Sequence, residues 1–332
     1  MAATTRFRTL KDMPTMDYIS PGNTLCAGCG GILAVRIFHK VLGPNVAWVN
    51  AAGCMTVTMS YPLSPLKSNW LYTAFASAPA GAQGVRDALD VLIAKGKIPA
   101  SEDMKVVVVT GDGAAYDIGL QSTAGAIDRH LDFYYLCYDN EAYGNTGFQV
   151  SSSTPYGSAT KTTPATASYP FGNAEKKKDL FEVWRSMKAP YVATLANSHG
   201  VDFLRKVEKG MAIRGPKLYI SLAACPTGWG FDSRESVELE KLAVATGVWP
   251  LKESVDGVVR HTVVPRALTP VKEYLKTQER FSHLFEPEEK TGAIAVIQES
   301  INGYWREAGA REGFQVKVPE PIARGAVELT GA

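Results

Sequence analysis

The chain has 332 residues, of which 45% are hydrophobic and 20% are charged, a composition typical of a globular protein with one large α/β domain or two small ones. Lysine and arginine together number 35 against 33 acidic residues, so the charge gives no indication of a nucleic-acid or membrane-surface partner. The first residues lack the apolar core of a signal peptide, and the sequence has no run of about 18 apolar residues. These features predict a cytoplasmic protein whose five cysteines stay reduced and act as ligands or core residues.

The first part of the chain alternates between polar turns and short apolar segments. Residues 1–20 are polar and irregular, and we expect them to form an arm that lies over this chain or over a neighbouring subunit. A glycine-rich turn then holds Cys26 and Cys29 in a C-x-x-C arrangement. The spacing of the apolar residues predicts a helix after this turn, and then a strand that ends before Gly53 and Cys54.

Predicted strands and helices alternate along most of the chain. The strands are expected over residues 45–50, 106–110, 132–138, 191–195, 217–223 and 258–264. The helices are expected over residues 32–42, 80–94, 117–130, 179–187, 201–211 and 291–308. This alternation is typical of βαβ units, so we expect an α/β fold with a doubly wound, mostly parallel sheet. The pattern weakens late in the chain, which places one domain at residues 1–250 and a C-terminal extension, with a role in subunit contacts, at residues 251–332.

Three segments carry local expectations. Apolar spacing in the helix over residues 80–94 points four side chains inward, namely Val85, Ala88, Leu89 and Leu92. Residues 151–170 are rich in Ser, Thr, Gly and Pro, a composition found in flexible linkers. The three consecutive lysines that follow are expected to be a solvated surface run: Lys176, Lys177 and Lys178.

Two polar clusters follow neighbouring strands in the middle of the chain. Gly111, Asp112 and Gly113 come directly after the strand over residues 106–110, and Asn140 follows the next strand. The carboxyl ends of parallel strands meet at one edge of a sheet, which is where open α/β sheets bind ligands. We therefore expect both clusters to contribute to one binding site.

The residue types of these clusters suit a magnesium diphosphate. Mg²⁺ prefers oxygen ligands and usually combines one or two carboxylates with phosphate oxygens. Asp112 offers a carboxylate, Asn140 an amide oxygen and Ala142 a backbone carbonyl, while a helix beginning near Asp117 would direct N–H groups at the anion. The flanking glycines would let the backbone approach the phosphates. A nicotinamide-binding loop does not fit, because Tyr116 stands where G-x-G-x-x-G needs its third glycine.

The longer strings GDGAAYDIG and DNEAYGNTG resemble those of thiamine-diphosphate-binding domains, in particular the β subunit, or β-equivalent domain, of the 2-oxoacid:ferredoxin oxidoreductases. The resemblance covers about residues 18–250. It implies that residues 151–170 form an ordered loop near the cofactor. It also implies a set of cofactor-binding residues: Gly53, Cys54, Gly111, Asp112, Gly113, Asn140, Ala142, Asn145 and Thr146. Asn145 matches a position near the substrate carbonyl, which implies a catalytic role, although the residue could simply form a turn.

Four cysteines follow the ends of different predicted elements: Cys26, Cys29, Cys54 and Cys225, the last in a CPTGW turn. Four thiolates suit either a tetrahedral zinc ion or a [4Fe–4S] cluster, and their spacing leaves both open. The resemblance implies the proximal [4Fe–4S] cluster of the oxidoreductases. Cys137 lies inside a predicted strand and is assigned to the core.

The resemblance also implies an activity, which is the oxidative decarboxylation of a 2-oxo acid with coenzyme A to an acyl-CoA and CO₂. Electrons would pass to the cluster, then through ferredoxin-like and γ-type subunits to ferredoxin or another acceptor. No glutamate with a recognisable motif is available for the thiamine pyrimidine, so an α subunit is expected to supply it. The chain should then be inactive alone, in a hetero-oligomer with two or more copies. Pyruvate is the expected substrate, and an aromatic 2-oxo acid such as phenylglyoxylate is compatible. The alternatives are a cluster-free thiamine decarboxylase or synthase with a Cys₄ zinc site, and a non-catalytic scaffold subunit.

Overall fold

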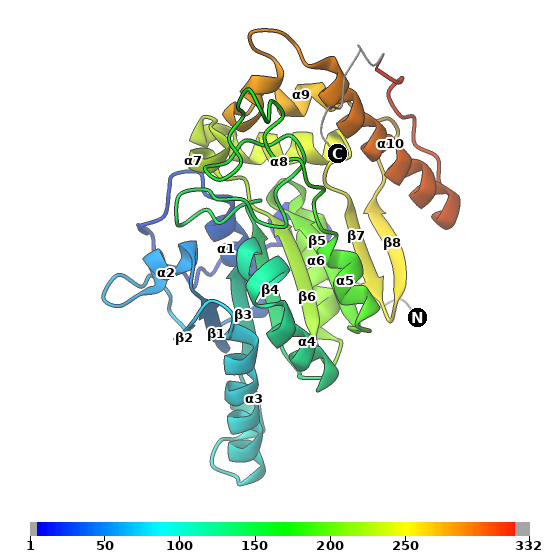
Figure 1. Ribbon diagram of the computed structural model, residues 1–332. Coiled ribbons are helices and arrows are strands. Elements are labelled where there is room, and N and C mark those ends of the chain that lie inside the picture. The colour runs from blue at the N-terminus through cyan, green and yellow to red at the C-terminus, as the bar shows by residue number, and fades with distance from the viewer. Residues whose placement is uncertain (1–4, 323–332) are drawn as a thin grey trace.

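An eight-stranded sheet runs through the computed structural model, which describes residues 5–322 (Figure 1). Its strands are β1 (Val46–Ala51), β2 (Asn69–Thr73), β3 (Lys105–Gly111), β4 (Tyr134–Asp139), β5 (Tyr191–Ala196), β6 (Lys217–Leu222), β7 (Leu251–Val255) and β8 (Val258–Val263). They lie in the order β2-β1-β3-β4-β6-β5-β7-β8. The first six strands are parallel, β7 pairs with β5 in antiparallel fashion and β8 with β7 likewise, which confirms the predicted doubly wound, mostly parallel sheet.

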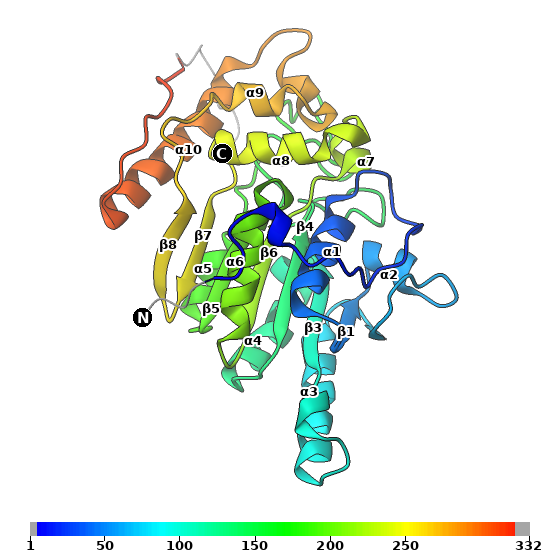
Figure 2. The same ribbon diagram turned by 180° about the vertical axis from the view of Figure 1, so that it is seen from behind.

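Helices cover both faces of this sheet. They are α1 (Gly30–Leu42), α2 (Cys54–Met59), α3 (Ala78–Ala94), α4 (Leu120–Asp128), α5 (Leu180–Ser186), α6 (Gly200–Met211), α7 (Pro226–Trp229), α8 (Ser236–Ala245), α9 (Lys272–Leu275) and α10 (Thr291–Glu312). Helices α3, α4 and α5 cover the face seen in Figure 1, and α1 and α6 cover the face seen in Figure 2. Among residues 5–322, none of the helices has the length and apolar character needed to cross a bilayer.

The valine run of β3 shows why this sheet is buried on both sides. Val106 and Val108 belong to the hydrophobic core under α3 and α4, whereas Val107 and Val109 belong to the core under α1 and α6. Successive side chains of a strand point to opposite faces, so a central strand needs apolar residues at every position. β-branched valine also suits the extended backbone.

The N-terminal arm lies over this chain. Phe7 is 1% exposed and belongs to the core beneath α1 and α6. Its carbonyl oxygen accepts a hydrogen bond of 2.8 Å from Arg205 Nε on α6. Residues 1–4, which the prediction also included, lie outside the described residues.

The inward face predicted for α3 is only partly correct. Leu89 is buried and Val85 is half-buried, but Ala88 and Leu92 are exposed, so the prediction was wrong for those two residues. The reason is visible in Figure 1, where the second half of α3 extends beyond the end of the sheet. Helical spacing identified the helix, but spacing does not tell how far the neighbouring strands reach.

Six of the helices and strands were not predicted: β2, α2, α7, α8, β7 and α9. β7 pairs with β5 in antiparallel fashion, and β8 pairs with β7, so the chain after residue 250 continues the same sheet. The domain division at residue 250 and the use of residues 251–332 in subunit contacts stay predictions, and residues 323–332 lie outside the described part of the chain. Cys137 on β4 is fully buried, which confirms its place in the core.

Candidate active site

The predicted site residues come together at the carboxyl ends of four parallel strands. Gly53 and Cys54 follow β1, Asp112 follows β3, Asn140 follows β4 and Cys225 follows β6. The parallel register sets Gly111 opposite Tyr138, which brings the residues just beyond both strand ends to the same level. The sheet therefore places both polar clusters at one edge.

Three oxygen ligands predicted for Mg²⁺ converge at this edge. The amide of Asn140 directs one terminal atom to within 2.8 Å of Asp112 Oδ1 and 2.7 Å of the Ala142 carbonyl oxygen. With nitrogen at that position the amide donates to both acceptors. With the amide oxygen at that position, the oxygens of Asn140, Asp112 and Ala142 face one another, and a cation bound between them would stabilise this arrangement. The donor set thus fits Mg²⁺, which takes oxygen ligands.

The surroundings of Asp112 also favour a cation. Its side chain is fully buried, and Oδ2 accepts a hydrogen bond of 2.5 Å from Ser151 Oγ. Burial and the neighbouring carboxylate of Asp139 raise the pKa of Asp112 well above its usual range. A divalent cation in contact with the carboxylate would offset both effects.

The helical segment after Asp112 begins earlier than predicted. Gly113–Ile118 forms one turn of π-helix before α4, so the segment starts beside Asp112 and not near Asp117. Gly113 is needed here for a reason that the sequence did not reveal. A Cβ on Gly113 would lie 2.5 Å from Cδ1 and 2.8 Å from Cζ of Tyr143, whose ring packs against this turn. The glycine therefore makes room for a side chain of the same protein.

A cavity of about 180 Å³ opens above these residues. Eight of the nine predicted cofactor-binding residues line it, namely Gly53, Cys54, Gly111, Gly113, Asn140, Ala142, Asn145 and Thr146. The ninth, Asp112, lies beneath the surface, as its full burial requires. The remaining lining residues, which sequence reasoning missed, are Ala52, Phe75, Tyr138, Tyr143 and Gly144. The aromatic rings among them supply an apolar wall opposite the polar cluster.

A second cavity, of about 790 Å³, adjoins the first and is lined by three of the four predicted cluster ligands, Cys26, Cys54 and Cys225. Cys29 lies close enough to raise the pKa of the Cys54 thiol. Among residues 5–322, no three His, Cys, Asp or Glu side chains converge on a point that could hold a single metal ion.

The buried thiols of Cys54 and Cys225 would need a nearby positive charge to ionise. Burial raises the pKa of Cys54 to about 12 and that of Cys225 to about 11, and the neighbouring thiols add to both shifts. The backbone N–H of Gly228 donates to Cys225 Sγ at 3.4 Å. Thiolates are stable in such surroundings when iron compensates their charge, so the residues fit a metal cluster.

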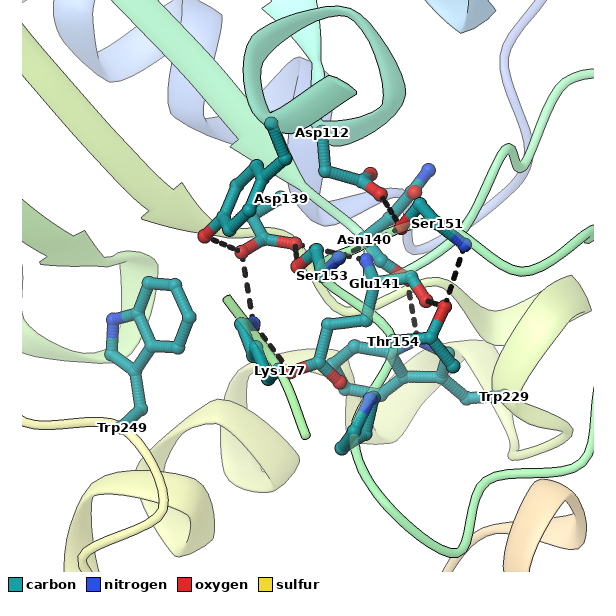
Figure 3. Close-up of polar contacts among 12 residues, drawn as sticks. Asp112, Asp139, Asn140, Glu141, Ser151, Ser153, Thr154, Lys177, Trp229 and Trp249 are labelled. Carbon is teal, nitrogen blue, oxygen red and sulfur yellow. Dashed lines mark hydrogen bonds and ion pairs between the residues drawn. The ribbon is translucent and has the colours of Figure 1, made fainter. Parts of the chain in front are cut away.

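A buried ion-pair network surrounds the turn that holds Asn140, which is predicted to bind Mg²⁺ (Figure 3). Lys177 Nζ lies 2.9 Å from a carboxylate oxygen of both Asp139 and Glu141. Asp139 also accepts hydrogen bonds from Tyr116 Oη at 2.6 Å and from Ser153 Oγ at 2.5 Å. The network holds the residues on either side of Asn140.

The expected solvated lysine run is therefore wrong for Lys177. Lys177 is the cation of the buried network, and Lys178 Nζ donates to the Tyr116 carbonyl oxygen at 2.5 Å. Lys176 is exposed as predicted. The lysine segment follows the Ser/Thr-rich loop back to the strand ends. Lys177 and Lys178 therefore lie close to buried oxygen acceptors there.

The Ser/Thr-rich loop is ordered by the same residues. Ser151 contacts Asp112, and Thr154 Oγ1 donates to the Glu141 carbonyl oxygen at 2.8 Å. Both side chains are buried, so the predicted ordered loop near the site is confirmed and the linker interpretation is excluded. No local sequence pattern around Ser151 or Thr154 would have identified these contacts.

The C-terminal extension reaches the site through Arg280. Its Nη2 pairs with Glu141 Oε2 at 2.7 Å, and its guanidinium carbon lies 3.9 Å from the centre of the Trp229 ring. The Trp229 indole N–H in turn donates to the Asn140 carbonyl oxygen at 2.9 Å. Glu141 has a φ of 64°, and its two ion pairs hold the residue in this left-handed conformation. Sequence reasoning missed Arg280, because no motif surrounds it.

Comparison with known proteins agrees with this geometry. Residues 51–220 match the family model described as thiamine pyrophosphate enzyme, C-terminal TPP binding domain. The chain is 43% identical over 272 residues to pyruvate synthase subunit PorB of Methanocaldococcus jannaschii, covering 82% of this chain and 91% of the relative. It is also 43% identical over 297 residues to the PorB subunit of Methanothermobacter thermautotrophicus, covering 89% of this chain and 98% of that protein.

Two more distant proteins extend the comparison. The chain is 35% identical to ketoisovalerate oxidoreductase subunit VorB of Pyrococcus furiosus, in an alignment that covers 86% of this chain and 92% of that protein. A solved structure of 2-oxoglutarate:ferredoxin oxidoreductase from Magnetococcus marinus has the same fold, with a TM-score of 0.52, 22% identity and coverage of 69% of this chain and 81% of that one. The chain therefore belongs to the family of thiamine-diphosphate-dependent 2-oxoacid:ferredoxin oxidoreductase β subunits, to which the pyruvate synthase subunits PorB also belong.

Proposed function

We propose that this chain is the β subunit of a pyruvate oxidoreductase, with a Mg²⁺-bound thiamine diphosphate and a [4Fe–4S] cluster held side by side. The overall reaction joins pyruvate and coenzyme A to acetyl-CoA and releases CO₂, one proton and two electrons. The electrons leave through the cluster towards ferredoxin. The observation that carries the proposal is that Cys54, Gly144 and Asn145 line both cavities.

The chain's own residues have defined parts in holding the cofactor. When bound, thiamine diphosphate supplies stabilisation of the carbanion left by decarboxylation. Asp112, Asn140 and Ala142 would hold its Mg²⁺, and Ser151 fixes the orientation of the Asp112 carboxylate through one hydrogen bond. Asn145 lines both cavities, which supports a catalytic role in contact with substrate over a purely turn-forming one.

The cluster would be held by Cys26, Cys29, Cys54 and Cys225. Three of them line one cavity, and Cys29 lies close enough to raise the pKa of the Cys54 thiol, which supports one group held by all four thiolates. Cys54 also lines the smaller cavity, which supports electron transfer between the two groups.

The small cavity supports a requirement for partner subunits. At about 180 Å³ it is below the roughly 300 Å³ at which complete pockets for organic ligands begin. We propose that an α subunit completes the pocket and supplies the pyrimidine-binding glutamate, and that ferredoxin-like and γ-type subunits carry the electrons onward in a cytoplasmic complex with two or more copies. The names of the PorB relatives support pyruvate as substrate, whereas none of these relatives is named for an aromatic 2-oxo acid.

The cluster is tested by spectroscopy of the anaerobically purified complex. We expect a broad absorbance near 400 nm that bleaches when pyruvate and coenzyme A are added together, with an EPR signal of the reduced cluster. Cys225→Ser should remove this chain's signal, whereas Cys137→Ala, at the buried core cysteine, should retain it. One zinc per chain without this absorbance would support the non-redox alternative and contradict the proposal.

The metal ligand is tested by cofactor retention. Asp112→Asn removes the carboxylate at the predicted Mg²⁺ site, and we expect the purified complex to lose its thiamine diphosphate. Asp128→Asn, the same substitution at the exposed last residue of α4, should have no effect. Full retention and turnover in Asp112→Asn would favour the scaffold alternative.

A further inference from the structure

Arg280 is a buried cation, and one of its hydrogen-bond donors has no partner among residues 5–322. It lies in a 3₁₀ helix, Glu279–Leu284, and its side chain is 1% exposed. Nε donates to Gln278 Oε1 at 2.9 Å, and Nη2 contacts Glu141 Oε2 at 2.7 Å and Tyr274 Oη at 3.3 Å. Nη1 alone has no hydrogen-bond partner among residues 5–322.

The same side chain forms part of the wall of the larger cavity. Arg280 lines that cavity together with Cys26, Cys54 and Cys225. Its guanidinium carbon lies 3.9 Å from the centre of the Trp229 ring, and the backbone N–H of Glu279 donates to the Gly230 carbonyl oxygen at 3.1 Å, which fastens this segment to α7. The guanidinium is thus held by Gln278, Glu141 and Trp229 in a position where only 1% of the side chain reaches water.

An unpaired, buried, charged donor is unfavourable. Leaving such a group without a partner costs about 1–3 kcal/mol, and more when it is charged. Sulfur atoms of the proposed cluster would be acceptors in the cavity that Arg280 lines.

We propose that Arg280 donates a hydrogen bond from Nη1 to a sulfur atom of the [4Fe–4S] cluster and thereby raises the cluster's reduction potential. This role rests on the proposed function, since it requires the cluster at Cys26, Cys29, Cys54 and Cys225. One-electron reduction makes the cluster one unit more negative and takes up no proton. A buried cation and an N–H···S hydrogen bond stabilise that state more than the oxidised one.

The neighbouring charges do not cancel this effect. Glu141 lies on the Nη2 side of Arg280, and its other carboxylate oxygen is paired with Lys177. The other charged residues that line the cavity, Glu279 and Lys161, are exposed, so water and salt screen them. Of the described charged residues that line this cavity, Arg280 alone is both positively charged and buried.

The test is an EPR-monitored redox titration of the assembled complex with dithionite as the electron donor. The signal of this chain is identified as the one lost in Cys225→Ser. We expect Arg280→Gln to shift the midpoint potential of that signal to a more negative value. Arg280→Lys should give a smaller shift in the same direction, because it keeps the charge but loses the planar fork. Lys161→Gln is the matched control, since it removes an exposed charge from the same cavity, and we expect little shift.

The outcomes separate this inference from the proposed function. An unchanged potential in Arg280→Gln, or an equal shift in Lys161→Gln, would overturn the role of Arg280 while leaving the cluster in place. Absence of the signal from the unmodified complex would instead overturn the proposed function. Should Arg280→Gln fail to assemble, the double variant Glu141→Gln/Arg280→Gln removes both members of the buried ion pair and allows the same measurement.

Discussion

Substitution of Gly113 by alanine tests the packing of the cofactor turn directly. The added Cβ would lie 2.5 Å and 2.8 Å from two ring atoms of Tyr143 and closer still to a third. Carbon atoms in contact normally lie about 3.5–4.0 Å apart, so the ring would have to move by about 1 Å. It is not free to do so, because it stacks on Phe75 with ring centres 5.8 Å apart and its hydroxyl donates to Asp117 at 3.3 Å.

The expected loss follows from this crowding. Forcing an extra methyl group into a packed site costs about 1–3 kcal/mol. Because Tyr143 also lines the smaller cavity, its displaced ring should enter the space proposed for the cofactor. We expect the affinity for thiamine diphosphate to fall by about tenfold or more, the equivalent of about 1.4 kcal/mol.

Thermal denaturation and calorimetric titration with thiamine diphosphate and Mg²⁺ would measure both effects in the assembled complex. Gly84→Ala is the matched control, since its Cβ would meet nothing within 4 Å and alanine is favoured over glycine in a helix by about 1 kcal/mol. It should raise the melting temperature. Adding Tyr143→Ala to Gly113→Ala should recover part of the loss. If Gly113→Ala alone left stability and affinity unchanged, the reasoning about this turn would be refuted.

Three further substitutions have expected results of known sign. His39 is fully buried and burial lowers its pKa to about 4 from 6.5, so the folded state resists a proton that the unfolded chain takes up. The stability that neutral His39 contributes is therefore lost as the pH falls from about 6.5 towards 4, and the loss reaches about 2 kcal/mol at about pH 5. His39→Phe should remove this loss, which melting curves at pH 7.5 and pH 5 would measure. Lys177→Met should destabilise the protein by about 3–5 kcal/mol in urea denaturation, because it leaves two buried carboxylates without their shared cation. Gly210→Ala should lower the melting temperature because its Cβ would collide with the Tyr219 hydroxyl, and Tyr219→Phe should restore it.

Each of these has a result that would count against it. Equal pH dependence in His39→Phe and the unmodified protein would mean that another group governs the acid transition. Lys176→Met, at the exposed neighbour, should stay within about 0.5 kcal/mol, and a loss equal to that of Lys177→Met would contradict the buried network. Failure of Tyr219→Phe to rescue Gly210→Ala would show that the helix, and not the hydroxyl, resists the methyl group.

The convergence of Asp112 and Asn140 could be predicted because it depends on local order. Asp112 and Asn140 each stand one residue beyond a strand, and the strands β3 and β4 are neighbours in a parallel sheet. Strand ends can be inferred from where β-branched runs stop, and the parallel crossover then fixes which ends meet. The same argument located Cys54 and Cys225 at the edge that holds Asp112.

The supporting network could not be predicted, because its members meet only after the whole chain has folded. Lys177 lies in a run of three lysines whose composition is the same whether a member is exposed or buried. Arg280 has no motif around it and contacts Glu141 from the far end of the chain. Ser151 is one of several serines in a row, and only the folded loop determines which of them reaches Asp112.

The wall that Cys54, Gly144 and Asn145 form between the two cavities limits how this protein can change over evolution. A bulkier residue at any of these positions would narrow both cavities at once, so under the proposed function substrate range and electron uptake could not be adjusted separately there. Under the same proposal, variation in substrate preference is expected to arise on the α subunit's side of the pocket, where a substitution leaves the cysteine-lined cavity untouched.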